Sequence, residues 1–235
     1  MKATFDHVED IAANIKTFWF KPEVPVRYIA GQFTELYLPH DNADDRGIKR
    51  WFTLSSSPTD PMVSITTKFA TDRSSTFKQT LQQLKPGTEL MLADPMGDFV
   101  LPKDKAIPLL FVAGGIGVTP VHSMVKYLAD TNEQRDIQLL YAATNENELA
   151  FKDLFESYKM RKLEYVIKAP SPNWKGETGS LTTERILEAV SNSEDMLIYL
   201  SGPEPMVETF DKELKAAGIN KHRLVTDFFP GYKPF

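Results

Sequence analysis

The stretch Ala106-Ile-Pro-Leu-Leu-Phe-Val-Ala-Gly-Gly-Ile-Gly-Val-Thr-Pro120 decides how the second half of this chain folds. It opens with a continuous apolar run, which is typical of a parallel strand buried on both faces. Glycines follow where that strand must turn, and residues 120–129 have the apolar spacing of a helix. This order of strand, glycine loop and helix predicts the first unit of a doubly wound α/β domain.

The same alternation continues to the end of the chain. Further strands are predicted over 137–142, 163–169, 196–200 and 223–228, and further helices over 148–158, 182–190 and 204–217. Strands that alternate with helices form parallel sheets, because each helix carries the chain back across one face. Residues 104–235 are therefore expected to form a domain built on a doubly wound parallel sheet.

Residues 1–103 have a different pattern. Short β-type runs, separated by Pro and Gly, occupy 15–20, 33–38, 49–54, 62–68 and 89–93. One helix is predicted over 75–84, with Phe77, Leu81 and Leu84 on one face. These features predict an antiparallel β-barrel or sandwich. No linker separates the two domains, so we expect them to pack directly and to leave a cleft between them.

Composition excludes several classes of function. The 235 residues include no Cys, so disulfides, thiolate metal sites, Cys-ligated iron–sulfur clusters and thiol nucleophiles are ruled out. The four His are scattered, and no metal site is predicted. A net charge of −5 gives no reason to expect nucleic acid as a partner. No apolar stretch reaches the roughly 20 residues of a membrane span, so we expect a soluble, cytoplasmic monomer.

The glycine loop has two possible roles: it binds a phosphate, or it only forms the tight turn between the strand and the helix. Gly115 and Gly117 leave no Cβ to block a phosphate, and the helix that follows offers free N–H groups. Thr119 is predicted to cap that helix, with Pro120 as its first residue. The alternative is a tight turn that binds nothing.

The second strand of this domain ends without an acidic or basic residue at its tip. An acid there would favour the ribose hydroxyls of NAD. Glu146 and Glu148 lie just beyond the strand. The sequence therefore leaves NADH and NADPH open.

Two segments of the first half also carry candidate binding groups. Arg50-Trp-Phe-Thr53 puts a guanidinium, two aromatic rings and a hydroxyl on one strand, with Arg50 and Phe52 on one face. The alternative is an edge arginine beside core aromatics. Ser74-Ser-Thr76 opens the predicted helix, where hydroxyls either cap it or help to hold a phosphate.

Together and in this order, these segments resemble the ferredoxin–NADP reductase superfamily of flavoenzymes, from about residue 5 to the end. The matching motifs are Arg50-x-Phe52-Thr53, Ile65-Thr66-Thr67-Lys68, Ser74-Ser75-Thr76, Gly97-Asp-Phe99, the loop Gly114-Gly115-Ile-Gly117-Val-Thr119-Pro120, Ser201-Gly202-Pro203-Glu-Pro-Met206, and Asp227-Phe-Phe-Pro-Gly-Tyr232. Ser201 replaces the Cys of many relatives, and Asp227 replaces their Glu.

The resemblance implies a flavin-binding β-barrel, residues 1–103, and an NAD(P)-binding domain, residues 104–235. It places Arg50 on the flavin phosphates, Trp51 and Phe52 by the flavin, Thr53 near its reactive nitrogen, and Phe229 over its other face. Flavin contacts are also implied for 65–68 and 74–76, and nicotinamide-nucleotide contacts for Gly114, Gly115, Gly117, Thr119, Pro120, Gly202, Pro203 and Met206. Thr53, Ser201 and Asp227 are the implied catalytic residues.

The resemblance also implies a function. We expect an NAD(P)H-dependent oxidoreductase that passes electrons through FAD, with FMN as the less favoured flavin, to a separate acceptor such as a ferredoxin, a flavodoxin or another redox partner. The alternatives are a reductase of free flavin, ferric chelates or quinones, a flavin-bearing subunit of a larger complex, and a nucleotide-binding regulator without hydride transfer.

Overall fold

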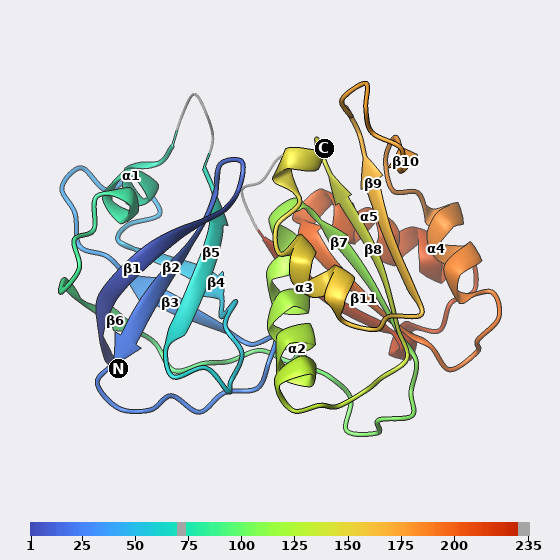
Figure 1. Cartoon of the computed structure of the whole chain (residues 1–235), viewed down its shortest axis with the longest axis horizontal. Coiled ribbons are helices and arrows are strands. Elements are labelled where there is room, and N and C mark those ends of the chain that lie inside the picture. The colour runs from blue at the N-terminus through green and yellow to red at the C-terminus, as the bar shows by residue number, and fades with distance from the viewer. Residues whose placement is uncertain (70–73, 230–235) are drawn as a thin grey trace.

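The computed structural model describes residues 1–69 and 74–229 and contains two six-stranded sheets that lie side by side (Figure 1). The first is antiparallel and the second is parallel and flanked by helices. The predicted combination of a β-barrel and a doubly wound domain is confirmed.

The antiparallel sheet is a nearly closed barrel. Its strands follow the order β4-β3-β6-β1-β2-β5, and an antiparallel bridge between Leu54 and Ile65 joins its two edges. The barrel is filled by buried apolar side chains, among them Phe5, Phe18 and Leu36. Its elements are β1 (Lys2–Ala12), β2 (Ile15–Pro22), β3 (Phe33–Tyr37), β4 (Lys49–Thr53), β5 (Val63–Lys68), α1 (Thr76–Gln82) and β6 (Glu89–Leu92).

Strand β1 is absent from the sequence predictions, although it is the longest in the barrel. Only Ala3 and Phe5 are fully buried along its length. Shifts in its pairing with β2, between Phe5 and His7 and again after Asp10, break the alternation of buried and exposed residues. A strand with so few buried positions leaves little trace in the hydrophobic pattern.

The parallel sheet has the order β10-β9-β8-β7-β11-β12, with the helices divided between its two faces. Helices α2 and α3 pack on one face, and α4 and α5 pack on the other. Figure 1 shows α2 between the two sheets. The elements are β7 (Leu109–Gly114), α2 (Thr119–Asp130), β8 (Ile137–Ala143), α3 (Lys152–Ser157), β9 (Lys162–Ile167), β10 (Glu177–Thr178), α4 (Thr183–Val190), β11 (Leu197–Pro203), α5 (Glu204–Ala216) and β12 (Leu224–Phe229).

The predicted start of the helix at residue 148 is wrong. A 3₁₀ turn, η2 (Glu146–Glu148), comes first, and α3 begins only at Lys152, after Phe151 in the left-handed conformation with φ 60°. The left-handed residue interrupts the helix, and the apolar spacing of the sequence does not reveal it. The predicted domain boundary at 103/104 lies between β6 and β7, and it stays a prediction.

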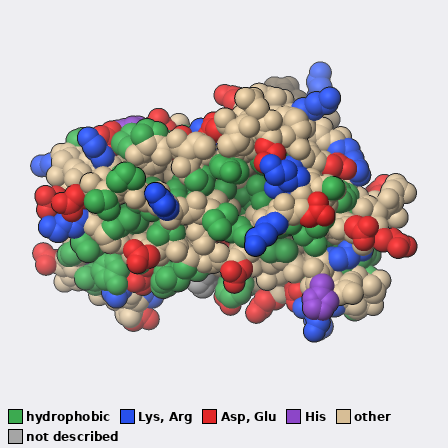
Figure 2. Space-filling view, turned by 90° about the horizontal axis from the view of Figure 1, so that it is seen from below, with side chains coloured by type: hydrophobic (Ala, Val, Ile, Leu, Met, Phe, Trp, Pro, Cys, Tyr) green, Lys and Arg blue, Asp and Glu red, His purple; other side chains and the backbone are tan. Residues whose placement is uncertain are grey.

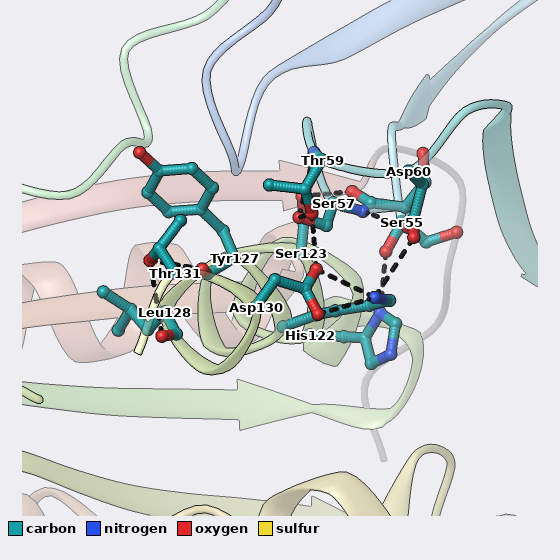
Figure 3. A network of polar contacts seen from close by, with 12 residues as sticks. Ser55, Ser57, Thr59, Asp60, His122, Ser123, Tyr127, Leu128, Asp130 and Thr131 are labelled. Atoms are coloured by element: carbon teal, nitrogen blue, oxygen red, sulfur yellow. Dashed lines mark hydrogen bonds and ion pairs between the residues drawn. The ribbon is translucent and has the colours of Figure 1, made fainter. Parts of the chain in front are cut away.

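The two domains are held together by hydrogen bonds between a barrel loop and α2 (Figure 3). The Ser123 hydroxyl donates to the carbonyl oxygen of Ser56 at 2.6 Å. Nδ1 of His122 lies 2.7 Å from the carbonyl oxygen of Ser55. Lys126 adds an ion pair to Asp60 at 3.1 Å. We call this set of contacts the α2 clamp.

His122 is a neutral member of the α2 clamp. Its ring stacks on Phe151 with centroids 3.7 Å apart. Burial lowers the pKa of His122 to about 4, so the imidazole carries no charge at neutral pH and Nδ1–H donates to the carbonyl of Ser55. Buried hydrogen bonds therefore fix the orientation of one domain on the other.

Replacement of Ser123 tests the contribution of the α2 clamp. Ser123 and Ser56 are both fully buried, so Ser123→Ala leaves a buried carbonyl oxygen without its donor. We expect the free energy of unfolding to fall by about 1–2 kcal/mol. Chemical denaturation measures this, and Ser157→Ala, which removes an exposed hydroxyl bonded to Leu154, is the control with an expected change below about 0.5 kcal/mol. Equal effects of the two substitutions would contradict the assignment.

Candidate functional site

The order of the parallel strands places a candidate site at one end of the sheet. The chain runs from β7 outward to β8 and β9, and then returns to β11 on the other side of β7. Ligands of such sheets bind outside the carboxyl ends of the strands, at the point where the order reverses. Here that point carries the glycine loop after β7 and Ser201 to Pro203 at the end of β11.

The glycine loop winds directly into a helix. Gly115 has φ +53° and starts a 3₁₀ turn, η1 (Gly115–Val118), which continues into α2. The prediction that Thr119 caps the helix is wrong, because Thr119 already has helical angles and Val118 is at the cap position. The Thr119 hydroxyl donates to the carbonyl of Ile116 at 3.0 Å, and Pro120 follows within the first turn.

The glycines let two loops cross in contact. A Cβ on Gly117 would lie 2.4 Å from the carbonyl oxygen of Ser201 and 2.5 Å from Cα of Gly202. A Cβ on Gly114 or on Gly202 would meet the side chain of Met206 at 2.6 or 2.5 Å. The sequence predicted that these two motifs share a site, and the structure brings them together. Gly114 and Gly117 are therefore required for close packing of the two loops. The sequence pattern had indicated only a phosphate site or a tight turn for this loop.

Three buried hydroxyls on the predicted site strands have no hydrogen-bond partner within the part of the chain that the structure describes. They belong to Thr53 on β4, Thr67 on β5 and Ser201 on β11. The turn η1 contacts both β5 and β11, so the strands of Thr67 and Ser201 meet the same turn. Buried polar groups are normally satisfied. The unpartnered hydroxyls fit a bound group with a polar edge between the two domains.

Ser201 and Asp227 are direct neighbours across two parallel strands. Their Cα positions pair in the register of β11 and β12, and Ser201 is fully buried. Burial raises the pKa of the Asp227 carboxyl to about 6, while a backbone hydrogen bond from Phe228 opposes the shift. The arrangement therefore holds a carboxyl group that titrates near neutral pH beside an unpartnered hydroxyl.

Arg50 is mostly buried, with 15% of its side chain exposed, and binds within its own loop. Nη2 donates to Asp44 at 2.7 Å, and the guanidinium lies over the ring of Phe77 at 5.0 Å. Phe52 packs near the same ring, with centroids 6.0 Å apart. Arg50 and Phe52 thus share a face, as the strand alternation predicted.

Trp51 points to the other side of β4 and is 49% exposed. Its ring meets that of Phe33 edge-on, with centroids 5.4 Å apart. On β5, Ile65 belongs to the barrel core, and the hydroxyl of Thr66 bonds to those of Thr17 and Ser55 at 2.7 and 2.8 Å. These two side chains of β5 are engaged within the barrel, in contrast to the unpartnered Thr67.

The start of α1 shows capping. The hydroxyl of Ser75 accepts a hydrogen bond from the backbone N–H of Lys78 at 3.3 Å. Nε2 of His40 lies 3.2 Å from the Thr76 hydroxyl, and the carbonyl of Ser74 accepts from Gln79. The capping alternative is confirmed for Ser75, and phosphate binding at 74–76 stays a prediction.

One site contact was missed in the sequence. Lys68 Nζ lies 2.7 Å from Glu148 Oε2. This ion pair joins the end of β5 in the barrel to the turn after β8 in the other domain. Glu148 therefore pairs with a cation, and its neighbour Glu146 accepts from the backbone of Ser171. No sequence signal links residues 80 positions apart. The pairing leaves the choice between NADH and NADPH open.

The motif from Asp227 to Tyr232 lies only partly within the described residues. Residues 230–232 are not among the described ones, and the strand β12 is described as far as Phe229 without its side chain. The predicted role of Phe229 therefore stays untested. Pro203 precedes α5 directly, and Met206 lies in its first turn against the glycine loop.

Two features are absent from residues 1–69 and 74–229. Within these ranges no group of three or more His, Cys, Asp or Glu is placed to hold a metal ion. No helix in the same part of the chain is long and apolar enough to cross a membrane. Figure 2 shows one face of the molecule, on which basic and acidic side chains are interspersed with apolar ones. This face has no continuous basic surface of the kind that binds nucleic acid.

Comparisons with known proteins agree with this geometry. Residues 111–212 match the family of oxidoreductase NAD-binding domains. The chain is 30% identical over 218 residues to the glycine betaine monooxygenase reductase subunit of Chromohalobacter salexigens, covering 88% of this chain and 58% of that protein. It spans between 58% and 65% of the length of the first three curated relatives that it matches.

Solved structures share the whole two-domain fold. The flavohem-like FAD/NAD-binding domain of nitric oxide dioxygenase from Vibrio cholerae superposes with a TM-score of 0.82 at 21% identity, covering 97% of this chain and 98% of that one. A ferredoxin–NADP⁺ reductase from Neisseria gonorrhoeae gives a TM-score of 0.80 at 17% identity, with the same coverage. At these identities the likeness shows the fold.

The crossing of the two loops predicts that Gly117→Ala is strongly destabilising. The carbonyl of Ser201 and Cα of Gly202 are backbone atoms, so they cannot make room for a Cβ unless the main chain shifts. We therefore expect a loss of more than about 2 kcal/mol in the free energy of unfolding. Gly218→Ala is the control, because Gly218 has φ +94° and open space around it, and should cost only about 1–2 kcal/mol. Thermal and denaturant unfolding compare the two. A Gly117→Ala protein as stable as the wild type would contradict the close crossing.

Proposed function

We propose that this chain is a member of the ferredoxin reductase-like superfamily and that it is an NAD(P)H-dependent flavoprotein reductase. It takes electrons from a nicotinamide nucleotide and passes them through bound FAD to a separate acceptor. The observation that carries the proposal is the set of buried, unpartnered hydroxyls of Thr53, Thr67 and Ser201, which belong to strands of both domains. A ligand with hydrogen-bonding edges at the domain junction accounts for all three.

The barrel residues hold the flavin. A bound flavin supplies the redox chemistry, because it accepts a hydride and releases electrons singly. Arg50 pairs with its phosphate, since a guanidinium matches the geometry of phosphate oxygens. Phe52 packs against the ring system, and Thr53 offers its hydroxyl to the polar edge. FAD is preferred to FMN, because the helix start at 74–76 provides a second phosphate anchor.

The second domain binds the nicotinamide nucleotide. The loop of Gly115, Gly117 and Thr119 lies at the switch point of the parallel sheet, where nucleotides bind in this type of fold. Ser201 and Asp227 stand side by side there, and we infer that they meet the nicotinamide ring. A carboxylate at that position stabilises the positive charge that the ring acquires when it loses a hydride.

The acceptor is a separate molecule. The 235 residues contain no Cys, so this chain brings no Cys-ligated cluster to carry electrons onward. The relative from Chromohalobacter salexigens is a reductase subunit of a monooxygenase. By analogy we infer a redox protein, such as an oxygenase component, as the acceptor. That this chain acts as a monomer in the cytoplasm stays a prediction.

An absorption spectrum of the purified protein, reconstituted with FAD, tests the proposal. We expect a flavin band that bleaches under anaerobic conditions with NADH or with NADPH, which also identifies the donor. A flavin-bound protein that neither nucleotide reduces would support a regulator or a subunit of a complex. A protein that binds neither FAD nor FMN would overturn the proposal.

Asp227 predicts a pH dependence. Its carboxyl is ionised above a pKa of about 6 and protonated below it, so the rate of flavin reduction by the nucleotide should rise between pH 5 and pH 7. In Asp227→Asn the rate should be about tenfold lower at pH 7 and flat across this range. Stopped-flow absorbance measures the rates, with Asp195→Asn, an exposed carboxylate, as the control. An unchanged pH profile in Asp227→Asn would refute this role.

A further inference from the structure

The guanidinium of Arg50 is enclosed by the turn that precedes its strand. Nη2 donates to Oδ1 of Asp44 at 2.7 Å. Nη1 donates to three backbone carbonyls, those of Arg46 at 2.9 Å, Gly47 at 2.9 Å and Lys49 at 2.6 Å. Four acceptors therefore surround the group that the proposed function assigns to the flavin phosphate.

These acceptors differ in what they contribute. The three carbonyls are neutral and fix the orientation of the guanidinium. Asp44 alone adds a full negative charge, and its side chain is 27% exposed. Hydrogen bonding from Arg46 is the main cause that lowers the pKa of Asp44 to about 2, so this group is a carboxylate at every pH at which the protein would work.

The turn itself places Asp44 against the guanidinium. The N–H of Gly47 donates to the carbonyl of Asp44 at 2.8 Å, and Gly47 adopts φ +68°, which favours glycine. Asp45, one position further, is exposed and forms no ion pair with Arg50 in the structure. The pairing with Asp44 is thus a product of a defined turn.

We propose that Asp44 competes with the flavin phosphate for Arg50 and so sets the affinity of the protein for phosphorylated flavins. The inference rests on the proposed function, in which Arg50 holds that phosphate. A phosphate binds best to a guanidinium whose donors and charge are not already shared. Asp44 occupies one arm of the fork and shares its negative charge between Arg50 and Arg46, and a phosphate brought alongside would be repelled by the carboxylate.

The opposite role, in which Asp44 orients Arg50 for the phosphate, is less consistent with the contacts. The carbonyls of Arg46, Gly47 and Lys49 also accept from the guanidinium, and Asp44→Asn keeps a side-chain oxygen for the backbone N–H of Arg46, which holds this turn. Removal of the charge should therefore leave Arg50 in place and strengthen its field. The two roles predict changes of opposite sign in flavin affinity.

Titration of the flavin-free protein with FAD, FMN and riboflavin, followed by quenching of flavin fluorescence, measures the effect. Asp44→Asn keeps an oxygen that accepts from Arg50, and it removes the charge together with the second oxygen, which accepts from Arg46. Asp45→Asn makes the same change in net charge one residue away. We expect Asp44→Asn to bind FAD and FMN about fivefold more tightly than Asp45→Asn does. Riboflavin, which has no phosphate, should bind equally to both.

A dissociation constant for FAD that is equal or higher in Asp44→Asn than in Asp45→Asn would overturn the proposal. Equal tightening for riboflavin would also overturn it, because the effect would then not involve phosphate. If the wild type and both variants bind none of the three flavins, the proposed function fails and the inference falls with it. Circular dichroism checks folding, and Asp44→Ala replaces Asp44→Asn if that variant does not fold.

Discussion

The contact on which the rest of the site depends is the crossing of two backbone loops at the carboxyl ends of β7 and β11. Gly117 approaches Ser201 and Gly202 so closely that no side chain fits between them. Because the loops touch, the glycine turn, Ser201 and Met206 occupy one small region, and the neighbouring strand β12 brings Asp227 alongside. The chemistry of this region follows from a packing constraint on main-chain atoms.

The junction between the domains buries apolar side chains, such as Ile15 and Phe99, in one cluster with those of α2, and it has two kinds of polar contact. The first kind consists of the short, buried hydrogen bonds of the α2 clamp to main-chain oxygens. The second kind is the partly exposed ion pair between the long side chains of Lys68 and Glu148. Exposed ion pairs contribute little to stability and are screened by salt, so the buried hydrogen bonds of the clamp contribute more to docking than this ion pair does. Two of the unpartnered hydroxyls, those of Thr67 and Ser201, belong to strands that meet the same turn, η1, at this junction.

The architecture could be predicted because its main strands and helices have strong periodicity, and β7 and its glycine loop are the clearest example. Strand β1 could not, since bulges break its alternation and few of its side chains are buried. That the glycine loop and Ser201 lie at one site was implied by the resemblance to a known family. The pairing of Arg50 with Asp44, and of Lys68 with Glu148, depends on turns and on domain docking, which a sequence pattern does not encode.

The two buried hydrogen bonds of the α2 clamp end on carbonyl oxygens, which every residue possesses. The information for this part of the docking therefore resides in α2, and the barrel contributes only the path of its backbone at 55 and 56. A barrel of quite different sequence would satisfy the same two donors, provided that the loop kept its course. This arrangement would let one barrel be exchanged for another during evolution while the parallel-sheet domain keeps these two donors.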